Sequence, residues 1–158
     1  MGVAGSGKTT VGAALAAALN VPYAEADSFH RPDSIAKMSA GVPLTDADRE
    51  PWLRRIAGWI GRHADGGVVS SSALKRRYRD VLRSGGPVWL LHLHGSRALI
   101  AERMASRTGH FMPVSLLDSQ FADLEPLDGD EPGLVVDAVQ SPQRIVEIAV
   151  SAFRALSA

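Results

Sequence analysis

A glycine-rich segment at the start of the chain constrains its fold more than any other feature. Residues 2–9 read Gly-Val-Ala-Gly-Ser-Gly-Lys-Thr and match the pattern G-x-x-x-x-G-K-[ST] without a mismatch. Glycines allow a tight turn whose backbone N–H groups converge on one anion at the start of a helix. The helix is predicted by apolar residues at the spacing of one helix face, namely Val11, Ala14, Leu15, Ala18 and Leu19. The segment therefore predicts a phosphate-binding loop. The alternative is a glycine-rich turn before an ordinary helix.

The polar side chains at the end of this loop indicate what it binds. Lys8 can supply charge to the β- and γ-phosphates of a nucleotide, and the Thr9 hydroxyl can reach Mg²⁺. We therefore expect ATP and Mg²⁺ as cofactors, with Lys8 acting in catalysis. The residues expected to bind ATP in this segment are Gly2, Gly5, Ser6, Gly7, Lys8, Thr9 and Thr10.

The stretch ahead of the loop departs from the usual arrangement. A loop of this kind normally connects a strand to a helix, but only Met1 precedes Gly2. In a doubly wound nucleotide-binding sheet that strand is central. We therefore expect the first strand to be missing or truncated, and hypothesise that several apolar residues precede Gly2 in the working protein.

The rest of the chain alternates short apolar runs with helical patterns. The expected strands are 21–23, 68–71, 88–93 and 133–136. Helical patterns are expected at 34–40, from Thr45 or Asp48 to 60, at 74–82, from 100 to near 109, at 114–127 and from 142 onward. Either Thr45 or Asp48 can cap the second of these, with Pro51 in its first turn. The alternation predicts an α/β fold with a parallel sheet and helices on both faces.

Length and composition limit the classes of function. A chain of 158 residues fits a single domain, 1–158. Its 17 Lys and Arg residues balance 17 Asp and Glu residues, so no overall field draws it to nucleic acid or to a membrane. The sequence has no cysteine and no apolar run long enough to span a bilayer. We therefore expect a cytoplasmic protein whose anion site is local.

Several motifs, in a fixed order, carry a family resemblance. Residues 27–30 read Asp-Ser-Phe-His, 35–38 read Ile-Ala-Lys-Met, 41–44 read Gly-Val-Pro-Leu and 46–53 read Asp-Ala-Asp-Arg-Glu-Pro-Trp-Leu. Ser-Ala-Leu-Lys-Arg-Arg-Tyr-Arg-Asp follows at 72–80, and Gly-His-Phe-Met-Pro at 109–113. Together with the phosphate loop, these motifs resemble the bacterial gluconokinase family from Gly2 to about Asp137.

The resemblance implies both a reaction and a fold. The reaction moves the γ-phosphoryl group of ATP onto D-gluconate with Mg²⁺, giving 6-phosphogluconate and ADP. The implied fold is a three-layer P-loop kinase fold, like that of shikimate and nucleoside monophosphate kinases, with a helical lid at about 103–125 and a homodimeric assembly. Two departures stand out: Glu25-Ala26-Asp27 replaces the usual Asp-Gly-Asp, and Ser71 replaces a usual cysteine.

Phosphoryl transfer to a sugar acid requires a carboxylate near the attacking hydroxyl and cations for the acid group. Asp27 is the candidate to orient the acceptor hydroxyl, accept its proton or hold Mg²⁺, unless it only caps the next helix. Glu25 is either close to the site or simply exposed. The expected substrate contacts are Asp27, His30, Lys37, Arg49, Lys75, Arg79, His110 and Gln120. Among them, Arg49, Lys75 and Arg79 are the cations available to the carboxylate of a sugar acid. Lys75 and Arg79 are four residues apart and share a helix face, so a solvated surface is their alternative.

Two arginines lie at the start of the expected lid, ahead of the stretch 109–113. Arg103 and Arg107 lie one turn apart and, by resemblance, reach ATP and the transferring phosphoryl group when the lid closes. The alternative is a basic helix end that favours the helix dipole. By analogy with this fold, we expect the adenine near 137–142. Another small P-loop kinase, acting on shikimate or a nucleoside monophosphate, and a nucleotide-binding module without catalysis remain the competing functions.

Overall fold

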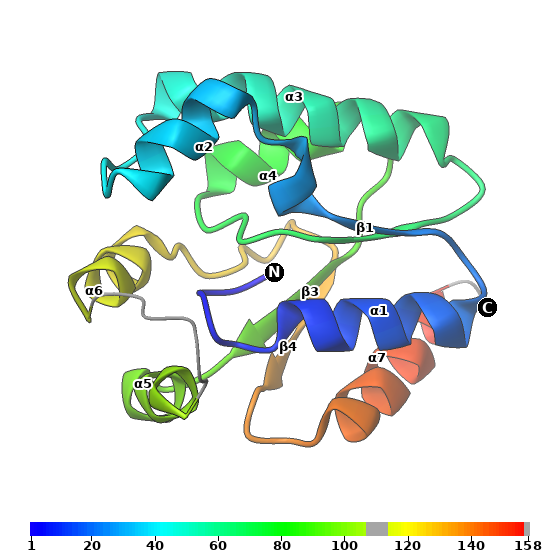
Figure 1. Ribbon diagram of the computed structural model, residues 1–158. Coiled ribbons are helices and arrows are strands. Elements are labelled where there is room, and N and C mark those ends of the chain that lie inside the picture. Colours follow the sequence, from blue (N-terminus) through cyan, green and yellow to red (C-terminus); the bar gives the residue numbers. More distant parts are fainter. Residues whose placement is uncertain (107–113, 157–158) are drawn as a thin grey trace.

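The protein is an α/β structure in which four parallel strands form two separate pairs (Figure 1). The computed structural model describes residues 1–106 and 114–156. Strand β1 (Tyr23–Glu25) pairs with β2 (Val68–Ser70), with Tyr23 opposite Val68. Strand β3 (Leu90–His94) pairs with β4 (Gly133–Asp137), with Leu90 opposite Gly133. The predicted α/β class with parallel strands is confirmed.

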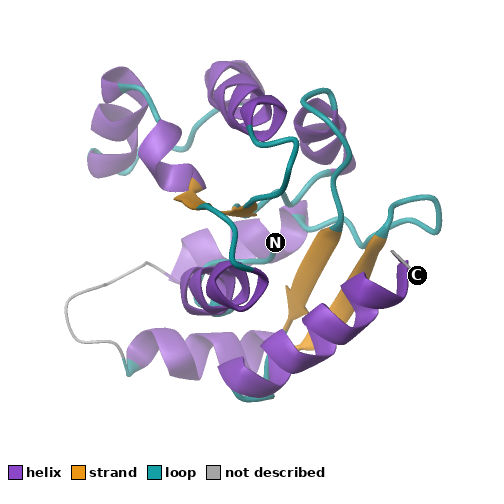
Figure 2. Ribbon diagram, turned by 90° about the vertical axis from the view of Figure 1, so that its right-hand side faces the viewer, coloured by secondary structure: helices purple, strands orange, loops and turns teal. Residues whose placement is uncertain are grey.

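The N-terminal residues lie between the two strand pairs (Figure 2). The Met1 amino group donates to the Leu91 carbonyl at 2.5 Å, and the Leu93 N–H donates to the Met1 carbonyl at 2.9 Å. On the other side, the Gly2 N–H donates to the Ser72 carbonyl at 3.2 Å. Among residues 1–106 and 114–156, no strand comes before Gly2 and the sheet is not closed across this position. The hypothesis that apolar residues precede Gly2 stays a prediction.

Helix α1 (Lys8–Leu19) follows the glycine-rich segment as the apolar spacing predicts. It begins after Gly7, whose φ is 97°, and ends at Asn20, whose φ is 56°. It contacts helix α7 (Pro142–Leu156), where the Ser141 hydroxyl accepts from the Arg144 N–H. Buried Val11 and Ile145 of these helices pack with Leu93 and Val136 of β3 and β4. These helices therefore cover one face of the longer strand pair.

A second helical layer lies on the opposite side of the strands (Figures 1 and 2). Thr45 rather than Asp48 is the N-cap of α3 (Asp46–Arg62), and the Asp48 side chain completes a capping box. Pro51 lies inside this helix and not in its first turn. Helices α3 and α4 (Arg76–Arg83) pack together through a core that includes Trp52, Leu53, Ile56, Tyr78 and Leu82.

The remaining elements are short helices. A short 3-10 helix, η1 (Ala26–Phe29), and helix α2 (Pro32–Ser39) connect β1 to α3. Helices α5 (Arg97–Ala105) and α6 (Val114–Asp123) contact each other beside the N-terminal segment. Val3, Leu74, Ile100 and Leu117 form the core there. Among the described helices, none is long and apolar enough to cross a membrane.

Candidate active site

The phosphate loop has the backbone geometry that its glycines permit. Gly5 and Gly7 adopt φ values of 76° and 97°, which strongly favour glycine. A Cβ added to Gly5 would also lie 2.8 Å from the Met104 side chain of α5. Ser6 is buried, and its hydroxyl has no hydrogen-bond partner within the described chain. The Ser6 hydroxyl therefore remains available to an anion at the start of α1.

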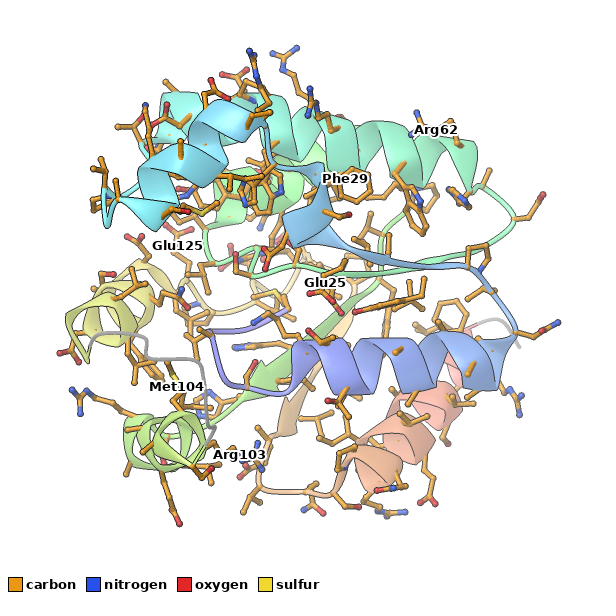
Figure 3. All side chains as sticks on the ribbon, in the orientation of Figure 1. Glu25, Phe29, Arg62, Arg103, Met104 and Glu125 are labelled. Atoms are coloured by element: carbon orange, nitrogen blue, oxygen red, sulfur yellow. The ribbon has the colours of Figure 1, made fainter. Side chains whose placement is uncertain are left out.

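Lys8 and Thr9 lie at the first turn of α1, facing different partners. The Lys8 ammonium donates to the Val3 carbonyl at 2.8 Å, across the base of the loop. The Thr9 hydroxyl donates to Oε1 of Glu25 at 3.1 Å. Figure 3 shows Glu25 between β1 and the beginning of α1. The contact between Thr9 and Glu25 thus joins the phosphate loop to the segment that carries the acceptor motif.

The oxygen groups beside Thr9 fit Mg²⁺. This ion prefers hard oxygen ligands and is commonly held by one or two protein groups together with phosphate oxygens. Thr9 and Glu25 offer a hydroxyl and a carboxylate in contact with each other. Within residues 1–106 and 114–156, no group of three or more His, Cys, Asp or Glu side chains is placed to hold a metal by itself. The donor set therefore suits a metal that arrives with a nucleotide.

A small cavity adjoins the loop where the adenine end of a nucleotide is expected. It has a volume of about 230 Å³, and its lining includes Ser6, Gly7 and Thr10 of the loop region. Arg103 of α5 lines the same cavity and donates to the Ala138 carbonyl at 2.5 Å (Figure 3). Ala138 belongs to the turn between β4 and α7. The cavity is thus formed by elements far apart in the sequence, and Arg103 connects two of them.

The expected acceptor residues Asp27 and His30 lie at the two ends of η1. Their side chains approach to 4.0 Å, with Asp27 87% exposed and His30 only 7% exposed. The His30 ring stacks on Trp52 of α3 at 4.5 Å between centroids. Burial lowers the pKa of His30, the nearby Arg49 charge lowers it further, and the Asp27 charge opposes both. His30 Nδ1 is buried without a hydrogen-bond partner among the described residues.

Two of the expected cations lie near this histidine, around the ring of Tyr78. Arg49 donates to the Tyr78 hydroxyl at 3.1 Å, and Lys75 lies 5.8 Å from the ring centroid. Lys75 also pairs with Asp123 at 3.1 Å, and this hydrogen bond raises its pKa. The Tyr78 hydroxyl in turn donates to Asp46. Tyr78 was not among the residues expected at the site, and its ring is also part of the core between α3 and α4.

Arg79 does not join this pocket. Its side chain is fully buried and pairs with buried Glu131 through two contacts of 2.7 Å. Its remaining N–H groups donate to the carbonyls of Ala73, Leu74, Glu125 and Pro126. A guanidinium has five N–H donors, and all are used here. The expected substrate contact of Arg79 is therefore corrected: the side chain holds the backbone together and leaves no donor for a ligand.

The other expected substrate residues are placed less directly. Lys37 of α2 pairs with Asp48 at 2.6 Å on an exposed surface, and this contact lowers the pKa of Asp48 to about 2. Gln120 of α6 accepts a hydrogen bond from the Ala4 N–H at 2.6 Å, so it contacts the phosphate loop itself. Arg107 and His110, with the central part of the expected lid, lie outside the described residues.

These features together define a class of protein, an ATP-dependent small-molecule kinase of the P-loop type. A family model described as shikimate kinase matches residues 4–120. The gluconokinase of Gluconobacter oxydans (strain 621H) is 43% identical to this chain over 159 residues, covering 98% of this chain and 89% of that protein. The thermosensitive gluconokinase of Escherichia coli (strain K12) is 46% identical over 139 residues, covering 85% of this chain and 74% of that protein.

Two solved structures are similar along almost the whole chain. A sugar kinase from Janibacter sp. HTCC2649 superposes with a TM-score of 0.91 at 51% identity, covering 98% of this chain and 91% of that one. A gluconokinase from Sinorhizobium meliloti 1021 gives a TM-score of 0.91 at 47% identity, covering 99% and 90%. The chain therefore belongs to the gluconokinase family, which confirms the resemblance seen in the sequence.

Proposed function

We propose that this protein phosphorylates D-gluconate, using the γ-phosphoryl group of ATP and releasing ADP and 6-phosphogluconate. The observation that carries the proposal is the contact between Thr9 and Glu25. It brings the phosphate loop beside η1, so that Asp27 and His30 follow within a few residues of the expected metal position. The gluconokinase relatives support the same acceptor.

Each group then has a separate task in an in-line transfer. The loop N–H groups and Lys8 bind the phosphates, while Thr9 and Glu25 would hold Mg²⁺, which would neutralise charge on the β- and γ-phosphates. Asp27 orients the acceptor hydroxyl and takes its proton late in the transfer, and it can also reach the metal through water. Arg103 and Arg107 are proposed to neutralise charge from the side of the lid.

The acceptor carboxylate is proposed to bind Arg49 and Lys75. Both cations lie at the Tyr78 ring, and both already pair with acidic groups, Asp46 at 3.9 Å and Asp123 at 3.1 Å. A sugar-acid carboxylate would join or replace these partners, while His30 hydrogen-bonds a hydroxyl. Lys37, His110 and Gln120 are proposed as further contacts through the family motifs.

Kinetics of charge-neutral variants test this assignment. Arg49→Gln and Lys75→Gln should each raise the KM for gluconate by about ten-fold or more, because each removes a charge-assisted hydrogen bond. The KM for ATP should change little. Arg54→Gln is the matched control, since Arg54 lies on the same helix as Arg49 but pairs with Glu50 on the exposed face.

The assay is ADP release measured with gluconate, shikimate and nucleoside monophosphates as acceptors. Turnover with shikimate or a nucleoside monophosphate, and none with gluconate, would assign another acceptor to the same fold. ATP binding without release of ADP on addition of any acceptor would instead indicate a binding module. We also propose a homodimer working in the cytoplasm, where the absence of cysteine suits the reducing conditions. Sedimentation velocity would test the dimer.

A further inference from the structure

A group of hydroxyls surrounds the Glu25 carboxylate behind the phosphate loop. The Tyr23 hydroxyl lies 2.5 Å from Oε2 of Glu25, while the Thr9 hydroxyl donates to Oε1 at 3.1 Å. The Tyr23 hydroxyl is also 3.0 Å from the Ser70 hydroxyl and 3.5 Å from the Thr9 carbonyl. One carboxylate is therefore held at both oxygens, by β1 on one side and by α1 on the other.

The Tyr23 hydroxyl donates its hydrogen bond to the Glu25 carboxylate. A phenol has one proton to donate, and a carboxylate is the strongest acceptor available to it. The contact with Glu25 is also the shortest of the three that the hydroxyl makes. Ser70 uses its own hydroxyl to donate to the Lys8 carbonyl at 2.9 Å, which connects the same group to the first residue of α1.

The packing around Tyr23 leaves little freedom for this arrangement to change. Gly12 of α1 faces the group, and a Cβ added there would lie 2.3 Å from the Ser70 hydroxyl and 2.9 Å from the Tyr23 ring. A glutamate side chain by itself has several freely rotating bonds, and ordering it costs conformational entropy. The Tyr23 hydroxyl supplies a second hydrogen bond, which keeps the Glu25 carboxylate within hydrogen-bond distance of the Thr9 hydroxyl.

We propose that Tyr23 is a positioning residue for the metal–nucleotide complex. It orients Glu25 so that the Glu25 carboxylate and the Thr9 hydroxyl together bind the metal ion. The inference rests on the proposed use of Mg²⁺ and ATP, and it adds a residue that touches neither. Because Tyr23 acts through Glu25, its hydroxyl should affect metal affinity and leave binding of the metal-free nucleotide unchanged. A purely structural tyrosine would change both together, or neither.

The test measures metal binding directly, without an acceptor and without turnover. Mn²⁺ binding to the protein–ADP complex is followed by electron paramagnetic resonance, and ADP binding in EDTA is followed by calorimetry. Tyr23→Phe should weaken Mn²⁺ binding about ten-fold, because it removes one hydrogen bond to a charged group. ADP affinity in EDTA should stay within about two-fold, which is below the effect of a typical hydrogen bond. Tyr78→Phe is the matched control, since it removes the other tyrosine hydroxyl of the chain without altering the Glu25 group.

A double-mutant cycle decides whether Tyr23 works through Glu25. In a Glu25→Gln background, Tyr23→Phe should have almost no further effect on Mn²⁺ affinity, because the carboxylate that it orients is already gone. An equal loss in both backgrounds overturns the proposal, as does unchanged Mn²⁺ affinity in Tyr23→Phe alone. If Tyr23→Phe does not fold, Glu25→Asp withdraws the carboxylate from the same hydroxyl and should also weaken Mn²⁺ binding.

The outcome is separable from the proposed reaction. A wild-type protein that binds Mn²⁺ and ADP but does not use gluconate would refute the acceptor and leave the role of Tyr23 to be decided by the cycle. A wild-type protein whose ADP complex takes up no Mn²⁺ would overturn the metal–nucleotide assignment and this inference with it.

Discussion

Breaking the buried ion pair between Arg79 and Glu131 should strongly destabilise the fold, and Glu131→Gln tests this. Both side chains are 0% exposed, and the two contacts of the guanidinium with the carboxylate are each 2.7 Å long. Glutamine has nearly the same shape as glutamate, so the substitution removes the charge while leaving no cavity. The Arg79 charge would then remain buried without its main partner.

The expected cost follows from that unpaired charge. Breaking a buried pair by removing one partner destabilises a protein by about 3–5 kcal/mol, whereas a domain has roughly 5–15 kcal/mol in total. Arg83 and Arg76 lie 3.7 and 3.8 Å from the same carboxylate, so three cations lose an anion when Glu131 is replaced. We therefore expect urea unfolding of Glu131→Gln to begin at a much lower urea concentration, with an unchanged slope.

The pair should also make stability depend on pH. The hydrogen bonds from Arg79 lower the pKa of Glu131 below its usual value of 4.5. A depressed pKa in the folded state means that this stabilisation is complete above about 4.5 and is lost as the pH falls through the folded-state pKa. Glu131→Gln should therefore lose less stability than the wild type when the pH is lowered from about 5 to about 3. Urea titrations of both proteins across this pH range measure the difference.

The control is Glu147→Gln, which breaks the exposed pair of Arg144 and Glu147 in α7. Surface pairs of this kind contribute little, so its unfolding curve should nearly match the wild type. Equal stability of Glu131→Gln and the wild type would refute the reasoning about burial. If Glu131→Gln instead kept its stability and altered gluconate binding directly, Arg79 would belong to the acceptor pocket after all.

Two further predictions concern the phosphate loop and its helix. Lys8→Ala should lower kcat by roughly a hundred-fold or more in the ADP-release assay, because the Lys8 charge that stabilises the transferring phosphoryl group is lost. The circular dichroism spectrum should stay unchanged, and an unaltered kcat would contradict the assignment. Gly12→Ala should cost roughly 1–3 kcal/mol in urea unfolding, because the new Cβ collides with Ser70 and the Tyr23 ring. Gly58→Ala, whose new Cβ in α3 would make only an ordinary 3.5 Å contact with the Arg62 side chain, should instead stabilise by about 0.5–1 kcal/mol. A similar gain for Gly12→Ala would argue against the close packing.

The sequence predicted well those features that depend on local pattern. The positive φ values of Gly5 and Gly7, helix α1 after the loop and helix α7 from 142 onward are all set by neighbours in the chain. Asn20 likewise ends α1 where the apolar spacing stops. Such signals are readable because their physical causes lie within a few residues.

Features that depend on distant partners were not predictable in this way. The spacing of Lys75 and Arg79 suggested one shared helix face, but Arg79 turns to Glu131, 52 residues later in the chain. Glu25 left two open interpretations, and its contact with Thr9 exists only because β1 lies beside α1. Periodicity reports which face a residue occupies and does not report which partner the fold brings to it.

The segment between β2 and α4 connects the buried Arg79 side chain to the proposed acceptor site. Ala73 has a φ of 43°, an uncommon value for a residue with a side chain, and the backbone there must be held by its surroundings. Arg79 does this by donating to the Ala73 and Leu74 carbonyls. Lys75 follows immediately, so the position of the proposed carboxylate-binding cation depends on the buried arginine. We therefore propose that Arg79 supports the acceptor site indirectly, by fixing the backbone that presents Lys75, without contacting the acceptor itself.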